Sequence, residues 1–300
     1  MRLNSTNVWG LHACNILGVA FILGLAISAR AVEIADVPDD ADAVAPKGDV
    51  IRLFDGKSLG DCYTWLKDTQ RKDPRKVFSV VDGNLHISGD GLGALVTNKR
   101  YRDYHAVVEF KWGEKTWHDR VNRARDSGFL IHGNGRDGGY DGTWMPSLEV
   151  QIIEGGVGDF VPVPGVDEHG KLIPLSYTCN TGRDRDGEVV WKEDGPRETF
   201  KPHGYKRVNW FGRDPDWKDE KNVRGSQDKD SPHGEWTRID VICDGGHVVN
   251  YVNGTKVNEA FDVTPHAGHL QLQTELAEVD YRRWELWPLD KAPKPELAKQ

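Results

Sequence analysis

Two glutamates, Glu149 and Glu154, stand five positions apart in an apolar segment and could carry acid–base chemistry. In an extended strand successive side chains point to opposite faces, so Glu149 and Gln151 would share one face while Val150 and Ile152 share the other. The two glutamates would then fall on opposite faces, unless a β-bulge turned both to one side. Carboxyl groups that share a face could act as a general acid and a general base.

Polar side chains of similar kinds recur in two other segments with strand-like alternation. His132 ends the segment 128–132, while Gln271 and Gln273 alternate with leucines in the segment 268–274. An antiparallel sheet with one wet face alternates in this way by default. Glu, Gln and His in place of Lys, Thr and Arg favour a functional cleft, so we predict that the three segments lie in one sheet. The concave face of that sheet is expected to be lined by His132, Glu149, Gln151 and Gln273.

Short strands must position these side chains. Strand-like runs with turn signals between them recur along the chain, and no convincing amphipathic helix separates them. Asp82-Gly83 and Asn253-Gly254 each stand between two apolar runs, which is typical of two-residue β-hairpin turns. This many strands without helices predicts an all-β sandwich or jelly roll. The 11 Trp also suggest flat aromatic surfaces, which suit sugar rings.

The first 31 residues are typical of a secretory signal peptide. Arg2 precedes an apolar run over 16–27, and Ala29 and Ala31 form an A-x-A cleavage pattern. The run is shorter than the roughly 20 residues that a transmembrane helix needs, so we expect no membrane insertion after cleavage. The mature protein is therefore expected in the periplasm or outside the cell.

The rest of the chain predicts one domain. Residues 32–48 are acidic and rich in Ala and Pro, which indicates a flexible leader. A single domain is expected over 49–290, with a long, charged loop insertion at about 155–234 that would frame a site. Residues 291–300 are Pro- and Lys-rich, which indicates a frayed tail.

Charge and cysteine content exclude several classes of protein. The formal net charge of −8 argues against nucleic-acid binding, because phosphate neutralisation needs a basic face. Cleavage would leave Cys62, Cys179 and Cys243, so at most one disulfide could form within a chain. Their spacing is not that of a structural zinc site. The fold must therefore be stabilised by its hydrophobic core.

The spacing of Glu149, Gln151 and Glu154 resembles the E-x-D-x-x-E signature of retaining glucanases with a concanavalin-like sandwich. Gln151 stands where those enzymes have an aspartate that is a charged partner of the nucleophile. This resemblance would imply a conventional glycosidase acting through the two glutamates, whose carboxyl groups would then lie about 5 to 5.5 Å apart.

Nearly the whole chain, from Val50 to Leu289, resembles a second family, the 3-keto-disaccharide hydrolases. That family has a concanavalin A-like jelly-roll fold. Six motifs stand in the family's order: LFDGKSL from Leu53, RDSGFL from Arg125, EVQIIE from Glu149, GEWT from Gly234, YVNG from Tyr251 and LQTE from Leu272 followed by Ala277-Glu278. Two departures are visible: Leu276 stands where the family usually has Gly, and the 155–234 insertion is long and charged.

This second resemblance implies cleavage of 3-ketoglycosides. The C3 carbonyl of such a sugar acidifies the proton on C2, so its removal lets the glycosidic oxygen leave from C1 before water adds back. Glu149 or Glu154 would supply the base, and His132 an acid or a donor to the enolate. Glu149, His132 and Glu275 could together bind a divalent metal ion, because oxygen and imidazole ligands suit several such ions.

Other residues are expected to contact a carbohydrate substrate. Gln151, Gln273 and Glu275 would bind hydroxyl groups. Trp210 and Arg213 of the insertion have the spacing W-x-x-R and would combine an aromatic platform with a guanidinium. A non-catalytic sugar-binding module, in which the glutamates only accept hydrogen bonds, is a third hypothesis beside the two enzymes.

Overall fold

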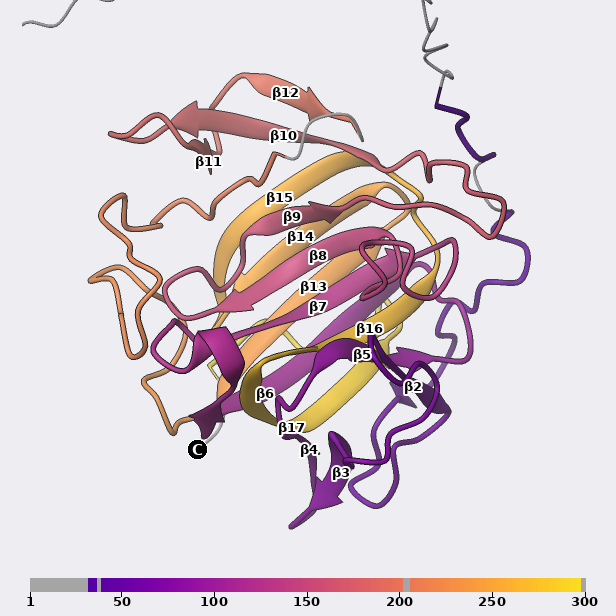
Figure 1. The fold of residues 1–300 in the computed structure, drawn as a ribbon. Helices are drawn as coiled ribbons and strands as arrows, with labels where there is room; N and C mark the ends of the chain where they lie inside the picture. The colour runs from indigo at the N-terminus through magenta and orange to yellow at the C-terminus, as the bar shows by residue number, and fades with distance from the viewer. Residues whose placement is uncertain (1–31, 37–38, 202–205, 298–300) are drawn as a thin grey trace, which may run out of the picture. The chain divides into compact units, whose positions relative to one another are not determined.

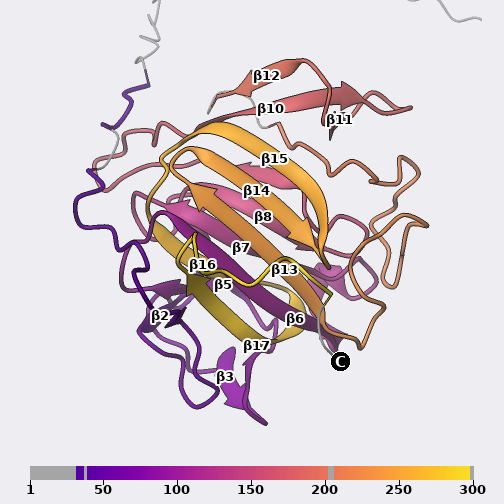
Figure 2. The same cartoon turned by 180° about the vertical axis from the view of Figure 1, so that it is seen from behind.

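Two antiparallel sheets pack face to face in the computed structural model, which describes residues 32–36, 39–201 and 206–297 (Figures 1 and 2). The all-β, concanavalin A-like jelly-roll sandwich expected from the sequence is confirmed. The predicted signal peptide, residues 1–31, lies outside the described residues. Apart from one 3-10 turn, η1 (His118–Arg120), the described residues form no helix, so none of them makes a helix that could cross a membrane.

The larger sheet has eleven strands. Its order is β11 (Val189–Trp191), β10 (Ser176–Arg183), β15 (Thr255–Thr264), β14 (His247–Val252), β13 (Thr237–Asp244), β6 (Tyr104–Thr116), β17 (Ala277–Trp287), β4 (Asn84–Ile87) and β3 (Phe78–Val81), with β1 (Ile51–Arg52) paired to β17 and β12 (Arg197–Phe200) paired to β10. The short first strand pairs with the last one, as Ile51 lies opposite Leu286.

The smaller sheet has six strands and carries the residues predicted to do chemistry. Its order is β2 (Cys62–Leu66), β5 (Leu92–Thr97), β16 (His269–Glu275), β7 (Asp126–Gly133), β8 (Ser147–Ile153) and β9 (Phe160–Val163). The prediction that the segments around 127, 147 and 268 share one sheet is therefore confirmed, because β7 pairs with β16 on one side and with β8 on the other.

Alternation along the strands divides the smaller sheet into an apolar face and a polar face. Val150 and Ile152 of β8, together with Leu270 and Leu272 of β16, are fully buried in the core between the two sheets. Their neighbours in the sequence must then point away from that core. The polar face of β8 and β16 is thus the one that the sequence predicted.

Both predicted hairpin turns are present. Asp82-Gly83 connects β3 and β4 with both residues at positive φ, and Asn253-Gly254 connects β14 and β15 in the same way. Positive φ at both central residues is the type I′ geometry, which matches the right-handed twist of the strands.

The segment 155–234 is more ordered than the long loop that was predicted. It contributes β9 to the smaller sheet and β10, β11 and β12 to the larger one. Its many Gly, Pro and charged residues conceal the alternation of these strands. The predicted flexible leader also lies against the domain, since Ile34 pairs with Leu172, and Val44 pairs with Tyr101.

Candidate active site

A glycine at the centre of the smaller sheet lets two polar side chains come together above it. Gly128 lies on β7, between Glu149 on β8 and Gln273 on β16. A Cβ atom at position 128 would lie 2.3 Å from Glu149 Oε1 and 2.6 Å from Gln273 Oε1. Both distances are too short for any real side chain, so only glycine allows this arrangement.

The polar face of β7 and β8 opens into a cavity of about 220 Å³. Three carboxyl groups line it, from Asp126, Glu149 and Glu275, together with the Gln151 amide and the Arg207 guanidinium. Asp126 comes from the same face of β7 as Gly128, two residues earlier. The site thus gathers three acidic groups and one cation around a space the size of a small ligand.

The three carboxyl groups do not titrate alike. Burial and the nearby charge of Asp126 raise the pKa of Glu149 well above its usual value. Burial, with the charges of Asp126 and Glu149, likewise raises the pKa of Glu275. Burial raises the pKa of Asp126 only to about 6, because the charges of Arg120 and Arg207 oppose it. Burial thus raises the pKa of all three carboxyl groups, and the charges of Arg120 and Arg207 limit this rise at Asp126.

Ion pairs with Arg120 hold two of the three carboxyl groups in place. Arg120 Nη2 lies 2.9 Å from Asp126 Oδ2 and 3.5 Å from Glu275 Oε1. This guanidinium is close enough to favour the charged form of either carboxyl group. Arg120 belongs to η1, so this short turn fixes one side of the site.

Several polar atoms of the site are buried without a hydrogen-bond partner among the described residues. They are Glu149 Oε1, Asp126 Oδ1, and both the oxygen and the nitrogen of the Gln273 amide. Buried polar groups in folded proteins are nearly always hydrogen-bonded, so these groups are suited to a ligand that is itself rich in donors and acceptors. A sugar has hydroxyl groups that can both donate and accept.

An aromatic wall lies beside the carboxyl groups. The rings of Tyr140 and Trp144 line the same cavity and stack at 6.0 Å with an interplanar angle of 15°. The Trp144 indole donates to the Gly93 carbonyl at 2.9 Å, and the Gln271 amide bonds the Met145 main chain at 3.3 Å in both directions. The loop that carries these rings is thus fastened across the sheet, and it bounds the cavity on that side.

The site brings together four of the predicted residues. Gln151 and Glu275 line the cavity with Glu149, and Gln273 lies next to Glu149 above Gly128. Leu276, where related sequences usually have Gly, adopts a φ of 62° directly after Glu275. A left-handed conformation costs a non-glycine residue about 1–2 kcal/mol, so the turn is kept in spite of the substitution.

The prediction that His132 shares the polar face is wrong. A β-bulge places Ile131 and His132 opposite a single residue of β16, and His132 has a φ of 55°. Its ring therefore turns into the sandwich, where it lies 6.0 Å from the buried Tyr104 ring. Burial lowers the pKa of His132 to about 3, so the imidazole is neutral in this apolar position.

The predicted partnership of Glu149 and Glu154 is also absent. Strand β8 pairs with β7 in unbroken register, so no bulge turns Glu154 toward the cavity. Its carboxylate is buried against Arg125 instead, with Oε1 2.5 Å from Nη1 and Oε2 accepting from the Arg125 main-chain N–H at 2.9 Å. The Asn222 N–H donates to the same Oε2 at 3.1 Å. Glu154 is thus committed to structural hydrogen bonds.

Trp210 and Arg213 do not form the expected sugar platform. The Trp210 ring is 1 % exposed and belongs to the core. The Arg213 guanidinium is buried, binds Asp159 Oδ2 at 2.7 Å and lies 4.4 Å from the centre of the Trp217 ring. Neither residue lines the cavity of Glu149.

Sequence reasoning missed Asp126, Arg120 and Arg207. Asp126 could have been found, because it precedes Gly128 by two positions and strand alternation places both on one face. Arg120 and Arg207 lie outside regular strands, so no periodicity indicates where they point.

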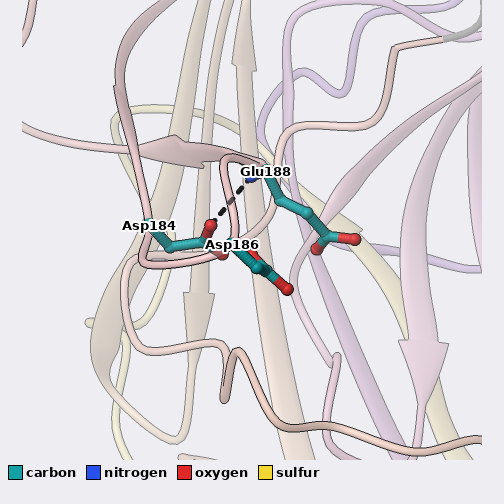
Figure 3. Close-up of side chains that lie close together, drawn as sticks. All are labelled: Asp184, Asp186 and Glu188. Carbon is teal, nitrogen blue, oxygen red and sulfur yellow. Dashed lines mark hydrogen bonds between the residues drawn. The ribbon is translucent and has the colours of Figure 1, made fainter.

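The predicted metal ligands Glu149, His132 and Glu275 are not brought together, because His132 lies on the other side of the sheet. A different acidic group, Asp184, Asp186 and Glu188, occupies the turn between β10 and β11, with ligand oxygens within 4.8 Å of one another (Figure 3). The Glu188 N–H donates to Asp184 Oδ1 at 2.8 Å. Asp186 and Glu188 are exposed, as solvated acidic turns commonly are.

Comparison with family models assigns most of the chain to one family. The family model of the 3-keto-alpha-glucoside-1,2-lyase-like domain matches residues 49–286. No curated protein matches the chain.

Solved structures are similar at low identity. A candidate glycosyl hydrolase from Parabacteroides distasonis is 19 % identical, with 80 % of this chain and 94 % of that chain covered and a TM-score of 0.46. A second one from the same organism is 17 % identical, with 81 % and 100 % covered and a TM-score of 0.44. The carbohydrate-binding module CBM66 from Bacillus subtilis is 8 % identical, with 69 % and 89 % covered and a TM-score of 0.39.

Proposed function

Because the chain belongs to the 3-keto-alpha-glucoside-1,2-lyase-like family, a family of carbohydrate-active proteins, we propose that it cleaves 3-ketoglycosides by removing the proton on C2. The C2–H electrons move to the C3 carbonyl and give an enolate. Re-formation of the carbonyl then expels the glycosidic oxygen from C1, and that oxygen takes a proton from an acid. Water finally adds across the C1–C2 double bond, with its oxygen on C1 and a proton on C2.

The group of three carboxyls around Gly128 is the observation that carries this proposal. They lie within one cavity, and burial together with their mutual charges raises the pKa of each of them, so ionisation of one favours a proton on another. A carboxylate with a raised pKa is a stronger base than an ordinary one, and a C–H proton needs such a base. In the proposal Glu149 takes the C2 proton, which also relieves its repulsion with Asp126.

Glu275 is the proposed acid for the leaving oxygen. Burial and then the charges of Asp126 and Glu149 raise the pKa of Glu275, so an ionised Glu149 favours a proton on Glu275, and both line the same cavity. Gln151 and Gln273 would bind hydroxyl groups beside the reacting carbons, and the Trp144 ring would pack against a sugar face.

The test compares a 3-keto-disaccharide with the same disaccharide in its unoxidised form, with and without a chelator. Cleavage of the keto sugar alone is expected, with solvent deuterium incorporated at C2. Glu149→Gln keeps the size of the side chain but removes the base, so turnover should fall by about 100-fold to 10,000-fold while binding changes little. Glu168→Gln, the same change on an exposed loop, is the control.

Two outcomes would contradict the proposal. Equal cleavage of the unoxidised disaccharide would favour a conventional glycosidase, in which Asp126 or Glu275 rather than Glu154 would be the second carboxyl beside Glu149. Binding of sugar by the wild-type protein without any turnover would favour a binding module. A chelator that abolishes turnover would instead add a metal ion to the mechanism.

A further inference from the structure

We propose that Arg207 stabilises the enolate oxygen of the substrate, and that Asp159 is the positioning residue that holds Arg207 at the cavity. This inference rests on the proposed elimination, since the enolate exists only on that path. It assigns a role to Arg207, which no motif of the sequence had indicated.

Arg207 is placed where a substrate could be contacted. Its side chain is 26 % exposed and lines the same cavity as Glu149, Asp126 and Glu275. Arg120 is the other arginine close to these carboxyls, but it does not line the cavity and is engaged with Asp126 and Glu275. Of these two guanidinium groups, Arg207 is therefore the one that a ligand in the cavity would meet.

Asp159 fixes the direction of Arg207. Its carboxylate is completely buried and accepts from Arg207 Nε at 2.8 Å, from Arg207 Nη2, from Arg213 Nη1 at 2.7 Å and from the Trp210 N–H at 2.7 Å. The main-chain carbonyl of Asp159 accepts from the Gln151 N–H at 3.0 Å, so the residue is bound to β8. Asp159 thus connects the segment that carries Arg207 with the strand that carries Glu149.

Charge supports the same assignment. Within the trio of Asp159, Arg207 and Arg213, two guanidinium groups share one carboxylate, so the trio as a whole is cationic. Burial raises the pKa of Glu149, of Asp126 and of Glu275, and in each case the charge of Arg207 acts in the opposite direction. Arg207 is thus a source of positive potential for the entire site.

The chemistry needs such a group. When the C2–H bond breaks, negative charge develops on the oxygen attached to C3, and donors aimed at developing charge are commonly worth 10²–10³ in kcat. A guanidinium is always protonated and offers several donors in a rigid plane, so it can stabilise this oxygen without transferring a proton. The unoxidised sugar has no C3 carbonyl and could not use this contribution.

The experiment measures turnover of a 3-keto-disaccharide and deuterium incorporation at C2 for the wild type, Arg207→Ala and Arg207→Lys. Arg185→Ala, an exposed arginine of the same insertion, is the control. Arg207→Ala should lower kcat by about 100-fold to 1,000-fold, with a parallel loss of C2 exchange. Arg207→Lys should retain part of the activity, because it keeps the charge but loses the planar fork.

Two further readouts separate catalysis from folding. Guanidinium salt should restore part of the turnover of Arg207→Ala, and the acidic limb of its pH profile should move to higher pH, because a charge that lowers the pKa of Glu149 has been removed. Asp159→Asn should lower kcat by about tenfold with KM changed less than about threefold. A proportional loss of folded protein in Asp159→Asn would overturn its assignment as a positioning residue.

The outcomes also separate this inference from the proposed function. If the wild type cleaves the keto sugar with C2 exchange and Arg207→Ala keeps kcat within about threefold of it, the role of Arg207 is wrong while the proposed function stands. Absence of rescue together with an unshifted pH profile would likewise overturn the inference. If the wild type shows no C2 exchange, the proposed function itself fails.

Discussion

Replacing Gly128 by alanine should disable the site while leaving the sandwich folded. The added methyl carbon would lie 2.3 Å from Glu149 Oε1, whereas ordinary van der Waals contact begins at 3.4 Å. The Glu149 oxygen must therefore move by about 1.1 Å, and the Gln273 oxygen, now at 2.6 Å, by about 0.8 Å. A misplacement of about 1 Å in a catalytic group costs on the order of 100-fold in rate, which is the loss of kcat that we expect.

Stability should change far less than activity. Extra atoms in a packed position destabilise by about 1–3 kcal/mol, and here the displaced atoms belong to side chains that border a cavity. Gly182→Ala is the matched control, because Gly182 also lies in a strand and the nearest atom to its Cβ would be Lys192 Cδ at 3.4 Å. Its kcat and melting temperature should remain close to those of the wild type.

The assay combines initial rates on a 3-keto-disaccharide with thermal melts and one double variant. If Gly128 acts by leaving room for Glu149, then Gly128→Ala combined with Glu149→Gln should be no slower than Glu149→Gln alone. Fully additive losses would mean that the two positions act independently. Wild-type turnover in Gly128→Ala would show that Glu149 does not need the space that Gly128 leaves for its side chain.

Three other predictions concern ionisation, packing and maturation. Because the pKa of Glu149 is raised in the folded protein, the folded state keeps a proton that the unfolded chain releases, so the free energy of unfolding should fall as pH rises above about 4.5. Glu149→Gln should therefore raise the melting temperature more at pH 8 than at pH 5, and a parallel pH dependence in both proteins would contradict this. Glu154→Gln leaves the buried Arg125 without its carboxylate and should cost about 3–5 kcal/mol in chemical denaturation, so a change below about 1 kcal/mol would contradict the structural role. N-terminal sequencing of the exported protein should find Val32 first, and retention of Met1 would refute the signal peptide.

The strands could be predicted because a period of two is visible in the sequence. Glu149 and Gln151 alternate with β-branched residues, and Gln273 alternates with leucines, so the face of each side chain followed from simple geometry. The same rule failed at His132, because a bulge shifts the alternation by one residue, and neither of the bulged residues, Ile131 and His132, is a glycine that would have marked it.

Residues outside strands could not be placed in the same way. Arg207 lines the cavity and is bound by Asp159, which directly precedes β9, and that contact joins residues 48 positions apart. The spacing of Glu149 and Glu154 in the sequence suggested a pair, but Glu154 is paired with Arg125, which directly precedes the neighbouring strand β7. Long-range ion pairs of this kind carry no periodic signal.

The pairing of β1 with β17 bears on when the domain can fold. Ile51 and Leu286 lie opposite each other although almost the whole domain separates them in the chain. Strand β6 also depends on late sequence, since β13 and β17 are its two neighbours. Sheets dominated by such distant pairings fold slowly, because loop closure must precede the contacts that reward it. The N-terminal half therefore cannot complete its sheets until the C-terminal strands have been synthesised.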